Sequence, residues 1–78
     1  ALSRYFAAVN RQAQLAKAAD ANELAVELAQ ERYNKGLVSY LEVTAAQQNL
    51  YAAQLEVLNN EAEVSNQQVA LYKALGGG

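Results

Sequence analysis

The stretch ERYNKGLVSYLEV, residues 31–43, decides how this chain folds, because it is the internal place where a strongly helical sequence stops and restarts. Gly36 lies near its centre and is the only glycine before residue 76. Glycine readily adopts the left-handed backbone conformation that commonly ends an α-helix. Leu37 follows, at a position where an apolar side chain folds back onto the last helical turn. We therefore predict that a first helix ends just before Gly36.

The residues after Gly36 predict the start of a second helix. Ser39 and Glu42 have the spacing of a capping box, in which the serine hydroxyl accepts a hydrogen bond from the Glu42 amide and the Glu42 carboxylate reaches back. Val38 and Val43 have the spacing of a hydrophobic staple. Together these signals predict an all-α fold, a long antiparallel helical hairpin that forms one unit over residues 1–78. Its parts are a helix at about 2–34, a turn at about 35–39, a helix at about 40–75 and a glycine exit at 76–78.

The composition is typical of long helices and argues against several classes of function. Alanine, leucine, glutamine and glutamate dominate the 78 residues, which contain no proline, cysteine or histidine. Disulfides and the common histidine-containing metal sites are therefore excluded, and a net charge of −2 argues against a nucleic-acid partner. No apolar run approaches the roughly 20 residues that span a bilayer, so we do not expect this chain to cross a membrane. Because it begins at Ala1 rather than Met, we expect a piece of a longer protein.

Apolar residues form several ordered rows along both helices. Rows with a spacing of seven are Val43, Leu50, Val57, Val64 and Leu71; Leu41, Leu55, Ala62 and Val69; and Tyr51, Leu58 and Tyr72. The first helix has one row of Tyr5, Leu15, Ala19, Val26, Ala29 and Tyr33 and another of Leu2, Phe6, Val9, Ala13, Leu24 and Leu28. Seven-residue spacing predicts coiled-coil packing, and several rows per helix require neighbours on more than one side. We expect the isolated chain to self-associate into a bundle.

Acidic residues are ordered as well. Glu42, Asn49, Glu56 and Glu63 share one heptad position, and Glu23, Glu27 and Glu31 follow one another at intervals of four beside Asp20. Like charges at that interval repel mildly, so local helix stability does not explain them. Two interpretations remain open. The rows form an ordinary solvated face, or they line a confined lumen where acidic side chains would favour cations.

The sequence gives little support to catalysis. Without histidine or cysteine, the usual pairs of nucleophile and base are missing. The three terminal glycines follow a helix rather than open one, so no phosphate-binding loop is indicated. Tyr5, Tyr33, Tyr40, Tyr51 and Tyr72 lie at helical spacing and are interpreted as packing residues. We therefore predict neither an enzyme nor a cofactor.

From Arg32 to Gly78 the chain carries short motifs at fixed spacing. They are Arg32-Tyr33, Gly36, Tyr40-Leu41-Glu42-Val43, the segment QNLYAAQ at 48–54 and the segment LYKALGGG at 71–78. With these motifs the chain resembles the second helical hairpin of TolC-family outer-membrane efflux channels, in the branch that works with resistance–nodulation–division pumps. The segment AVELAQERY at 25–33 also fits, so the resemblance covers essentially the whole chain.

The resemblance implies a setting that the chain alone does not contain. Family members are trimers whose outer-membrane channel continues into a long periplasmic α-barrel, in a Gram-negative bacterium. Each protomer contributes helical hairpins, and the hairpin tips meet the hairpin of a periplasmic adaptor protein that links the channel to an inner-membrane pump. The implied function is passive conduction of expelled substrates, with this chain as a periplasmic tip segment that docks to the adaptor and helps to form the lumen constriction.

The resemblance also implies roles for individual residues. It assigns Arg32, Gly36, Leu37, Val38 and Ser39 to the adaptor-docking tip and Leu41 and Glu42 to the lumen constriction. The acidic rows Glu56 and Glu63, and Glu23, Glu27 and Glu31, are then the lumen-facing rows. Several relatives have aspartate at the position of Ala45 and a charged residue near Gln48, so Glu42 would supply the acidic ring alone here. A second interpretation of Glu42 is that it only caps its helix.

Two other functions fit a helical hairpin. One is a structural coiled coil or spacer whose turn contacts nothing, which would accept changes at Val38 and Ser39 at the cost of helix stability only. The other is the adaptor's own hairpin, which also uses long antiparallel helices. The ending LYKALGGG argues against the adaptor.

Overall fold

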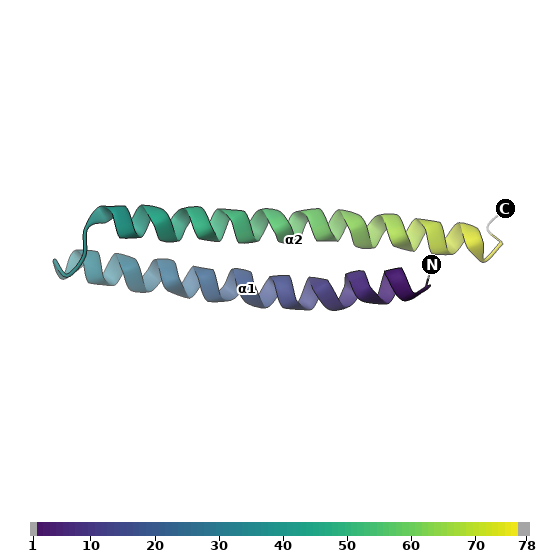
Figure 1. Cartoon of the computed structure of the whole chain (residues 1–78), viewed down its shortest axis with the longest axis horizontal. Coiled ribbons are helices and arrows are strands. Elements are labelled where there is room, and N and C mark those ends of the chain that lie inside the picture. The colour runs from purple at the N-terminus through teal and green to yellow at the C-terminus, as the bar shows by residue number, and fades with distance from the viewer. Residues whose placement is uncertain (1, 77–78) are drawn as a thin grey trace.

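The structure, a computed structural model, describes residues 2–76, and in this range the chain forms two long helices joined by a short turn (Figure 1). Helix α1 covers Leu2–Asn34 and helix α2 covers Tyr40–Ala74. The helices lie side by side and antiparallel, so that the turn is at one end and both termini are at the other (Figure 1). The molecule measures 62 × 14 × 11 Å. The helical hairpin predicted from the sequence is confirmed. Of the predicted glycine exit, Gly77 and Gly78 lie outside the described residues.

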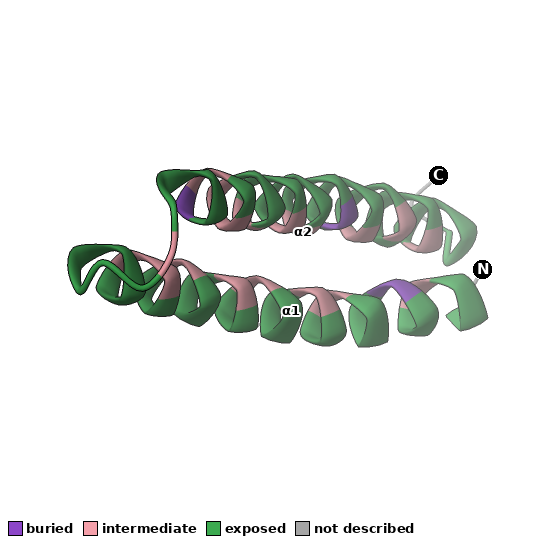
Figure 2. Cartoon of the chain, turned by 60° about the vertical axis from the view of Figure 1, so that its left-hand side comes forward, coloured by how far each residue is buried: buried purple, intermediate pink, exposed green. Residues whose placement is uncertain are grey.

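The helices meet along one seam whose residues alternate at spacings of three and four, which is the pattern of a coiled coil. The side chains along this seam are buried or half-buried, and the rest of each helix is largely exposed (Figure 2). The seam consists of Tyr5, Ala8, Gln12, Leu15, Ala19, Asn22, Val26 and Ala29 on α1, and of Val43, Ala46, Leu50, Ala53, Val57, Asn60, Val64, Gln67 and Leu71 on α2.

The sequence rows divide between this seam and the outside. The row that starts at Val43 lies in the seam, as does the row that starts at Tyr5, except that Tyr33 at its end is 41% exposed. The other three rows are exposed, including Leu24 at 66% on α1 and Tyr72 at 74% on α2. The hairpin thus covers one apolar face of each helix and leaves further apolar side chains without a partner inside the chain.

The seam contains a buried polar contact, the Asn60 clamp, which consists of Asn60, Gln12, Ala8 and Glu61. The Asn60 amide nitrogen donates to the Ala8 carbonyl oxygen at 2.9 Å and to Oε1 of Gln12 at 2.8 Å. The Gln12 amide in turn donates to Glu61 Oε1 at 3.3 Å. Asn60 and Ala8 are each only 6% exposed, and Val43 is the one other buried residue in the described part of the chain.

The clamp selects the register of the two helices. Most other seam residues are apolar or small, and two further polar ones donate within their own helices. Asn22 donates to the Ala18 carbonyl at 2.8 Å and Gln67 to Oε1 of Glu63 at 3.0 Å. If α2 slipped by one heptad, Asn60 would lie level with Ala19 or Tyr5 instead of Gln12, and its buried amide would lose the Gln12 acceptor. A buried amide without a partner costs about 1–3 kcal/mol, so the clamp disfavours slipped pairings.

We predict that Asn60→Ala lowers the free energy of unfolding by about 1–2 kcal/mol, because it removes two hydrogen bonds that cross the seam. Urea denaturation followed by far-ultraviolet circular dichroism measures this change. Asn59→Ala is the matched control, since Asn59 is exposed on the same helix, and it is expected to change stability by less than about 0.5 kcal/mol. Equal effects of the two variants would show that the clamp contributes no stability.

Candidate functional site

The tip of the hairpin begins with a tightly bonded end of α1. Gly36 has a φ of +76°, in the left-handed region. The Leu37 amide donates to the Arg32 carbonyl at 2.9 Å and the Gly36 amide donates to the Tyr33 carbonyl at 2.9 Å. This pair of bonds is a Schellman motif, which satisfies carbonyls that the end of a helix otherwise leaves open. The predicted role of Gly36 as the residue that ends the first helix is therefore what the backbone shows.

The start of α2 differs from the prediction. Ser39 is the N-cap, with an extended backbone, but its side chain makes no capping hydrogen bond. The Glu42 amide donates instead to the backbone carbonyl of Ser39 at 3.1 Å. The prediction of a capping box was therefore wrong, because the Ser39 side chain makes no capping hydrogen bond. Ser39 is exposed, so water competes for its hydroxyl, and Glu42 lies in a groove that also contains Arg32.

Apolar side chains are concentrated on the outside of the tip. Leu37 is 68% exposed, Tyr40 51% and Leu41 78%, within five consecutive residues. The Tyr40 ring packs edge to face against Tyr33, with ring centroids 5.1 Å apart, which connects the last turn of α1 to the first turn of α2. The tip is therefore a firmly built loop that presents apolar side chains to the surroundings, as a docking surface does.

The residues assigned to the tip and to the constriction have different environments. Val38 is half-buried, whereas Arg32, Leu37 and Ser39 are exposed. Arg32 and Glu42 line one groove between the helices, together with Ala25, Leu28, Ala29, Ala45, Ala46 and Asn49. Leu41 is not part of this groove. The two residues that the resemblance assigns to the constriction, Leu41 and Glu42, therefore lie on different sides of α2.

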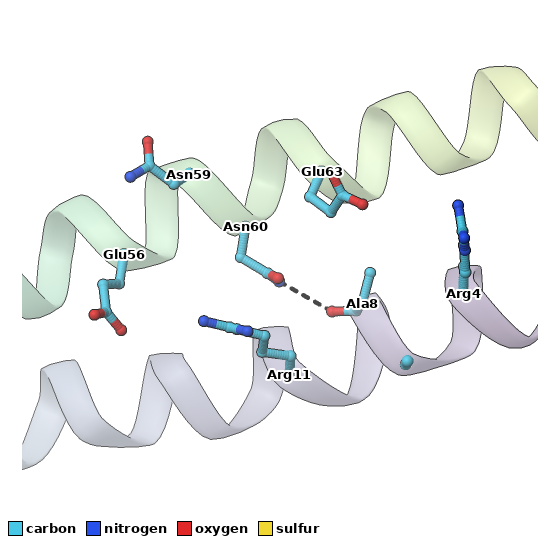
Figure 3. A pocket seen from close by; sticks show the side chains of 8 residues that line it. Arg4, Ala8, Arg11, Glu56, Asn59, Asn60 and Glu63 are labelled. Carbon is cyan, nitrogen blue, oxygen red and sulfur yellow. Dashed lines mark hydrogen bonds between the residues drawn. The ribbon is translucent and has the colours of Figure 1, made fainter.

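A second groove, farther from the tip, is also lined by arginine from α1 and glutamate from α2. Arg4 and Arg11 of α1 line it together with Glu56 and Glu63 of α2, beside the Asn60 clamp (Figure 3). Arg11 and Arg32 differ by three heptads, and so do Glu42 and Glu63, so both grooves lie on the same side of the seam. We call this side the charged flank; it consists of Arg4, Arg11, Arg32, Glu42, Glu56 and Glu63.

The charged flank brings a basic row of α1 opposite an acidic row of α2. It contains all three arginines of the chain and three of its glutamates, so its net charge is balanced. Among residues 2–76 the one salt bridge lies elsewhere, between Lys35 and Glu31 at 3.0 Å. The opposite charges of the flank therefore face each other across an open groove without direct contact, and they remain available to water and solutes.

The two predicted acidic rows lie on opposite sides of the seam. Glu56 and Glu63 belong to the charged flank. Ala16 and Asp20 line a groove on the other side, with Gln54 and Leu58. Glu23 and Glu27 follow Ala16 and Asp20 by one heptad and so lie on that second side, and Glu31 pairs with Lys35. The rows do not form one continuous acidic wall.

Two features were missed by reasoning from the sequence. The Asn60 clamp could have been found, because Asn60 lies three residues after Val57 and four before Val64 and hence on the same apolar face. The basic row could also have been found, since Arg4, Arg11 and Arg32 are separated by multiples of seven. In both cases the signal is the heptad spacing itself, extended from the apolar and acidic residues to asparagine and arginine.

Neither a membrane-spanning helix nor a metal site is found in the described residues. No helix within residues 2–76 is long and apolar enough to cross a bilayer. The same part of the chain contains no cluster of three or more side chains that could hold a metal ion.

The sequence pattern of the outer membrane efflux protein family matches residues 3–77, which is nearly the whole chain. The chain belongs to this family. Similar proteins include the solvent efflux pump outer membrane protein SrpC and the toluene efflux pump outer membrane protein TtgI, both of Pseudomonas putida. Each is 51% identical over 51 residues, which cover 65% of this chain and 11% of the relative.

A third relative of this efflux-protein chain is the probable efflux pump outer membrane protein SepC, also of Pseudomonas putida. It is 42% identical over 59 residues that cover 76% of the chain and 12% of the relative. The chain therefore spans only about a tenth of the length of these relatives. No solved structure matches it. The resemblance to outer-membrane efflux channels is confirmed at the level of the family, and none of these three names denotes an enzyme.

We predict that Ser39→Ala lowers the free energy of unfolding by less than about 0.5 kcal/mol, because the side chain makes no capping bond. Gly36→Ala is expected to cost about 1 kcal/mol, because alanine is strained at a φ of +76° although nothing lies within 4 Å of the added Cβ. Thermal unfolding of both variants measures the difference. A loss of unfolding free energy of about 1 kcal/mol or more in Ser39→Ala would contradict this expectation and would show that the Ser39 hydroxyl caps α2.

Proposed function

We propose that this chain is a periplasmic hairpin of an outer-membrane efflux channel, with its tip docked to the periplasmic adaptor of a tripartite export pump. The observation that carries the proposal is the exposed apolar tip, Leu37, Tyr40 and Leu41, in a chain of the outer membrane efflux protein family. The channel would conduct substrates passively, and the inner-membrane pump would supply the energy.

The construction of the tip supports docking. The Schellman motif holds the backbone of Arg32, Gly36 and Leu37 in one conformation, and the edge-to-face contact of the Tyr33 and Tyr40 rings restrains the other side of the turn. A partner that binds a pre-formed surface loses less conformational entropy than one that must order a flexible loop. The adaptor would cover Leu37, with Arg32, Val38 and Ser39 at the margin of the contact.

The remaining surface of the hairpin supports a place in the wall of a helical barrel. Beyond the seam, α2 exposes apolar side chains along its whole length, from Leu41 at 78% to Tyr72 at 74%. Exposed apolar rows of this extent are uncommon in isolated soluble proteins and suit a neighbouring helix. In a trimeric channel these rows would pack against adjacent hairpins.

Of the two sides of the seam, the charged flank suits a water-filled lumen better. Its arginines and glutamates face each other across open grooves without forming salt bridges, and Glu42 brings a carboxylate to the tip end of the row. A ring of Glu42 side chains in a trimer would favour cations at the constriction. Glu23 and Glu27 lie on the other side, so we assign them to the outer face of the wall.

Opening of the channel would change the contacts at the tip. The adaptor can bias opening only if it binds the open and closed arrangements with different affinities. If each hairpin moves as a rigid body about its contacts with neighbouring hairpins, a small displacement of the tip would widen the lumen. The stiff coiled-coil seam and the firmly bonded turn are suited to such rigid-body movement.

Leu37→Cys, in the full-length channel that contains this hairpin, is expected to give a covalent adduct with the adaptor when a cysteine-reactive crosslinker is applied to cells. The 78 residues contain no cysteine, so the introduced thiol is the only one in the hairpin. Leu24→Cys is the matched control, because Leu24 is 66% exposed against 68% for Leu37 but lies on the shaft of α1.

Adaptor capture at position 37 and not at position 24 would support docking, and loss of the adduct on mutation of the adaptor tip would strengthen it. If neither position captures the adaptor while the channel is present and folded, the chain is a structural hairpin whose turn contacts nothing.

Glu42→Gln is expected to lower the preference of the channel for cations, since it removes the carboxylate nearest the tip from the charged flank. Reversal potentials in planar bilayers under a salt gradient measure this preference. Glu27→Gln removes the same charge from the other side of the seam and is expected to leave the reversal potential unchanged. If both variants, or neither, shift it, the assignment of the charged flank to the lumen is wrong.

A further inference from the structure

The second groove of the charged flank contains a polar atom that the hairpin itself leaves without a partner. Asn60 is only 6% exposed, and its amide nitrogen donates twice, to the Ala8 carbonyl and to Oε1 of Gln12. Among residues 2–76 no group donates to the amide oxygen of Asn60, Oδ1. Because polar atoms of buried residues are nearly always hydrogen-bonded, this open acceptor indicates an occupant from outside the chain.

Oδ1 of Asn60 is open toward the groove rather than sealed between the helices. In the part of the chain that the structure describes, no fully enclosed side-chain nitrogen or oxygen lacks a partner, so this atom keeps access to the outside. Asn60 lines the groove, and its side chain points from α2 toward Ala8 (Figure 3). The groove has a volume of about 580 Å³, which is sufficient for a small organic molecule.

Groups of opposite charge lie on either side of this oxygen. Glu63 follows Asn60 by three residues and so lies on the same face of α2. Gln67 donates to Oε1 of Glu63 at 3.0 Å, which orients the carboxylate and leaves Oε2 without a partner among residues 2–76. Arg11 comes from α1, and in the view of Figure 3 Asn60 lies between Arg11 and Glu63. An acceptor pair and a guanidinium therefore face the same space.

We propose that this groove binds a small zwitterion, a solute that carries an ammonium and a carboxylate group as an α-amino acid does. The ammonium group donates to Oδ1 of Asn60 and to the carboxylate of Glu63. The carboxylate of the solute accepts from the Arg11 guanidinium, whose planar fork of donors matches its two oxygens. The inference concerns the groove of the hairpin itself and does not rest on the proposed function.

The charges around the groove favour a zwitterion over a simple ion. Arg4 and Arg11 contribute two positive charges and Glu56 and Glu63 two negative ones, so the groove as a whole attracts neither a lone anion nor a lone cation. A zwitterion meets both signs and adds no net charge. An ammonium group also offers only donors, which an amide oxygen can accept, whereas a carboxylate has no donor for the Asn60 oxygen.

The α1 side of the groove accommodates an apolar side chain on the solute. Ala7 and Ala8 line the groove between Arg4 and Arg11 in the sequence, and Ala7 is exposed. A side chain of the size of leucine would cover the Ala7 methyl group and remove apolar surface from water. The competing occupant is water, which can donate to the Asn60 oxygen but gains nothing from this apolar contact. A zwitterion with an aliphatic side chain is therefore the best-matched solute.

Nuclear magnetic resonance of the isotope-labelled 78-residue chain tests the site directly, with L-leucine added up to about 10 mM. The side-chain amide signal of Asn60 is expected to shift until the site is saturated. The side-chain amide signal of Asn22, which is bonded to Ala18 within α1 and lies outside the groove, should not move. If the Asn60 signal shows no saturable shift, only water occupies its oxygen and the proposal is wrong.

Two analogues of leucine test whether both charges are needed. Leucinamide keeps the ammonium group but lacks the carboxylate, and 4-methylpentanoate keeps the carboxylate but lacks the ammonium group. At about pH 6, where both amines are protonated, each analogue is expected to bind at least about fivefold more weakly than leucine. Binding of leucinamide as tight as that of leucine would show a cation site, and equally tight binding of 4-methylpentanoate an anion site. Either result would overturn the zwitterion.

Charge-removing variants test the assigned residues, with Asn60 left in place because it holds the seam. Glu63→Gln and Arg11→Gln are each expected to weaken leucine binding by more than about fivefold, since each removes one charged contact. Glu23→Gln and Lys17→Gln remove the same charges outside the groove and should leave binding unchanged. Circular dichroism checks that all four variants remain helical. Equal effects of the groove variants and their controls would overturn the assignment.

Discussion

The Asn60 clamp is the constraint on which the arrangement of this hairpin depends. The small and apolar seam residues hold the two helices together but allow more than one register, because successive heptads present similar side chains. The amide of Asn60 is buried against α1, where it donates to the Ala8 carbonyl and to Oε1 of Gln12, and only the Gln12 acceptor is specific to this alignment. A single polar residue therefore selects one register among several that the apolar seam would allow. The cost is that an apolar side chain at the same position would have buried more apolar surface.

That alignment determines which side chains lie level with one another on each side of the seam. With Asn60 level with Gln12, the arginine row of α1 faces the glutamate row of α2 on one side, and Ala16 and Asp20 face Gln54 and Leu58 on the other. It also sets the chain length left for the turn, which Gly36 and the ring contact of Tyr33 with Tyr40 close without strain in any non-glycine residue among those described. The closure of the tip and the levels at which arginines and glutamates meet on the charged flank are two results of one register.

The hairpin and its turn could be predicted because their signals are local. Gly36 ends a helix through its own backbone freedom, and the Val43 row follows from heptad spacing alone. The Ser39 capping box failed because exposed hydroxyl and carboxyl groups can form hydrogen bonds with water instead, which spacing does not reveal. The division of the acidic rows also required the structure, since intervals of four drift around the helix and carry Glu23, Glu27 and Glu31 across its surface. The adaptor contact and the lumen assignment remain predictions.

The seam is uninterrupted and both termini lie opposite the tip. The length of this hairpin can therefore change by whole heptads. Loss of seven residues from one helix would misalign every layer beyond the deletion. Loss of seven from each helix at the same level would shorten the rod by about 10 Å and leave every face and the turn unchanged. Paired insertions and deletions can therefore change the length of such a rod without redesigning either the turn or the end that carries the two termini.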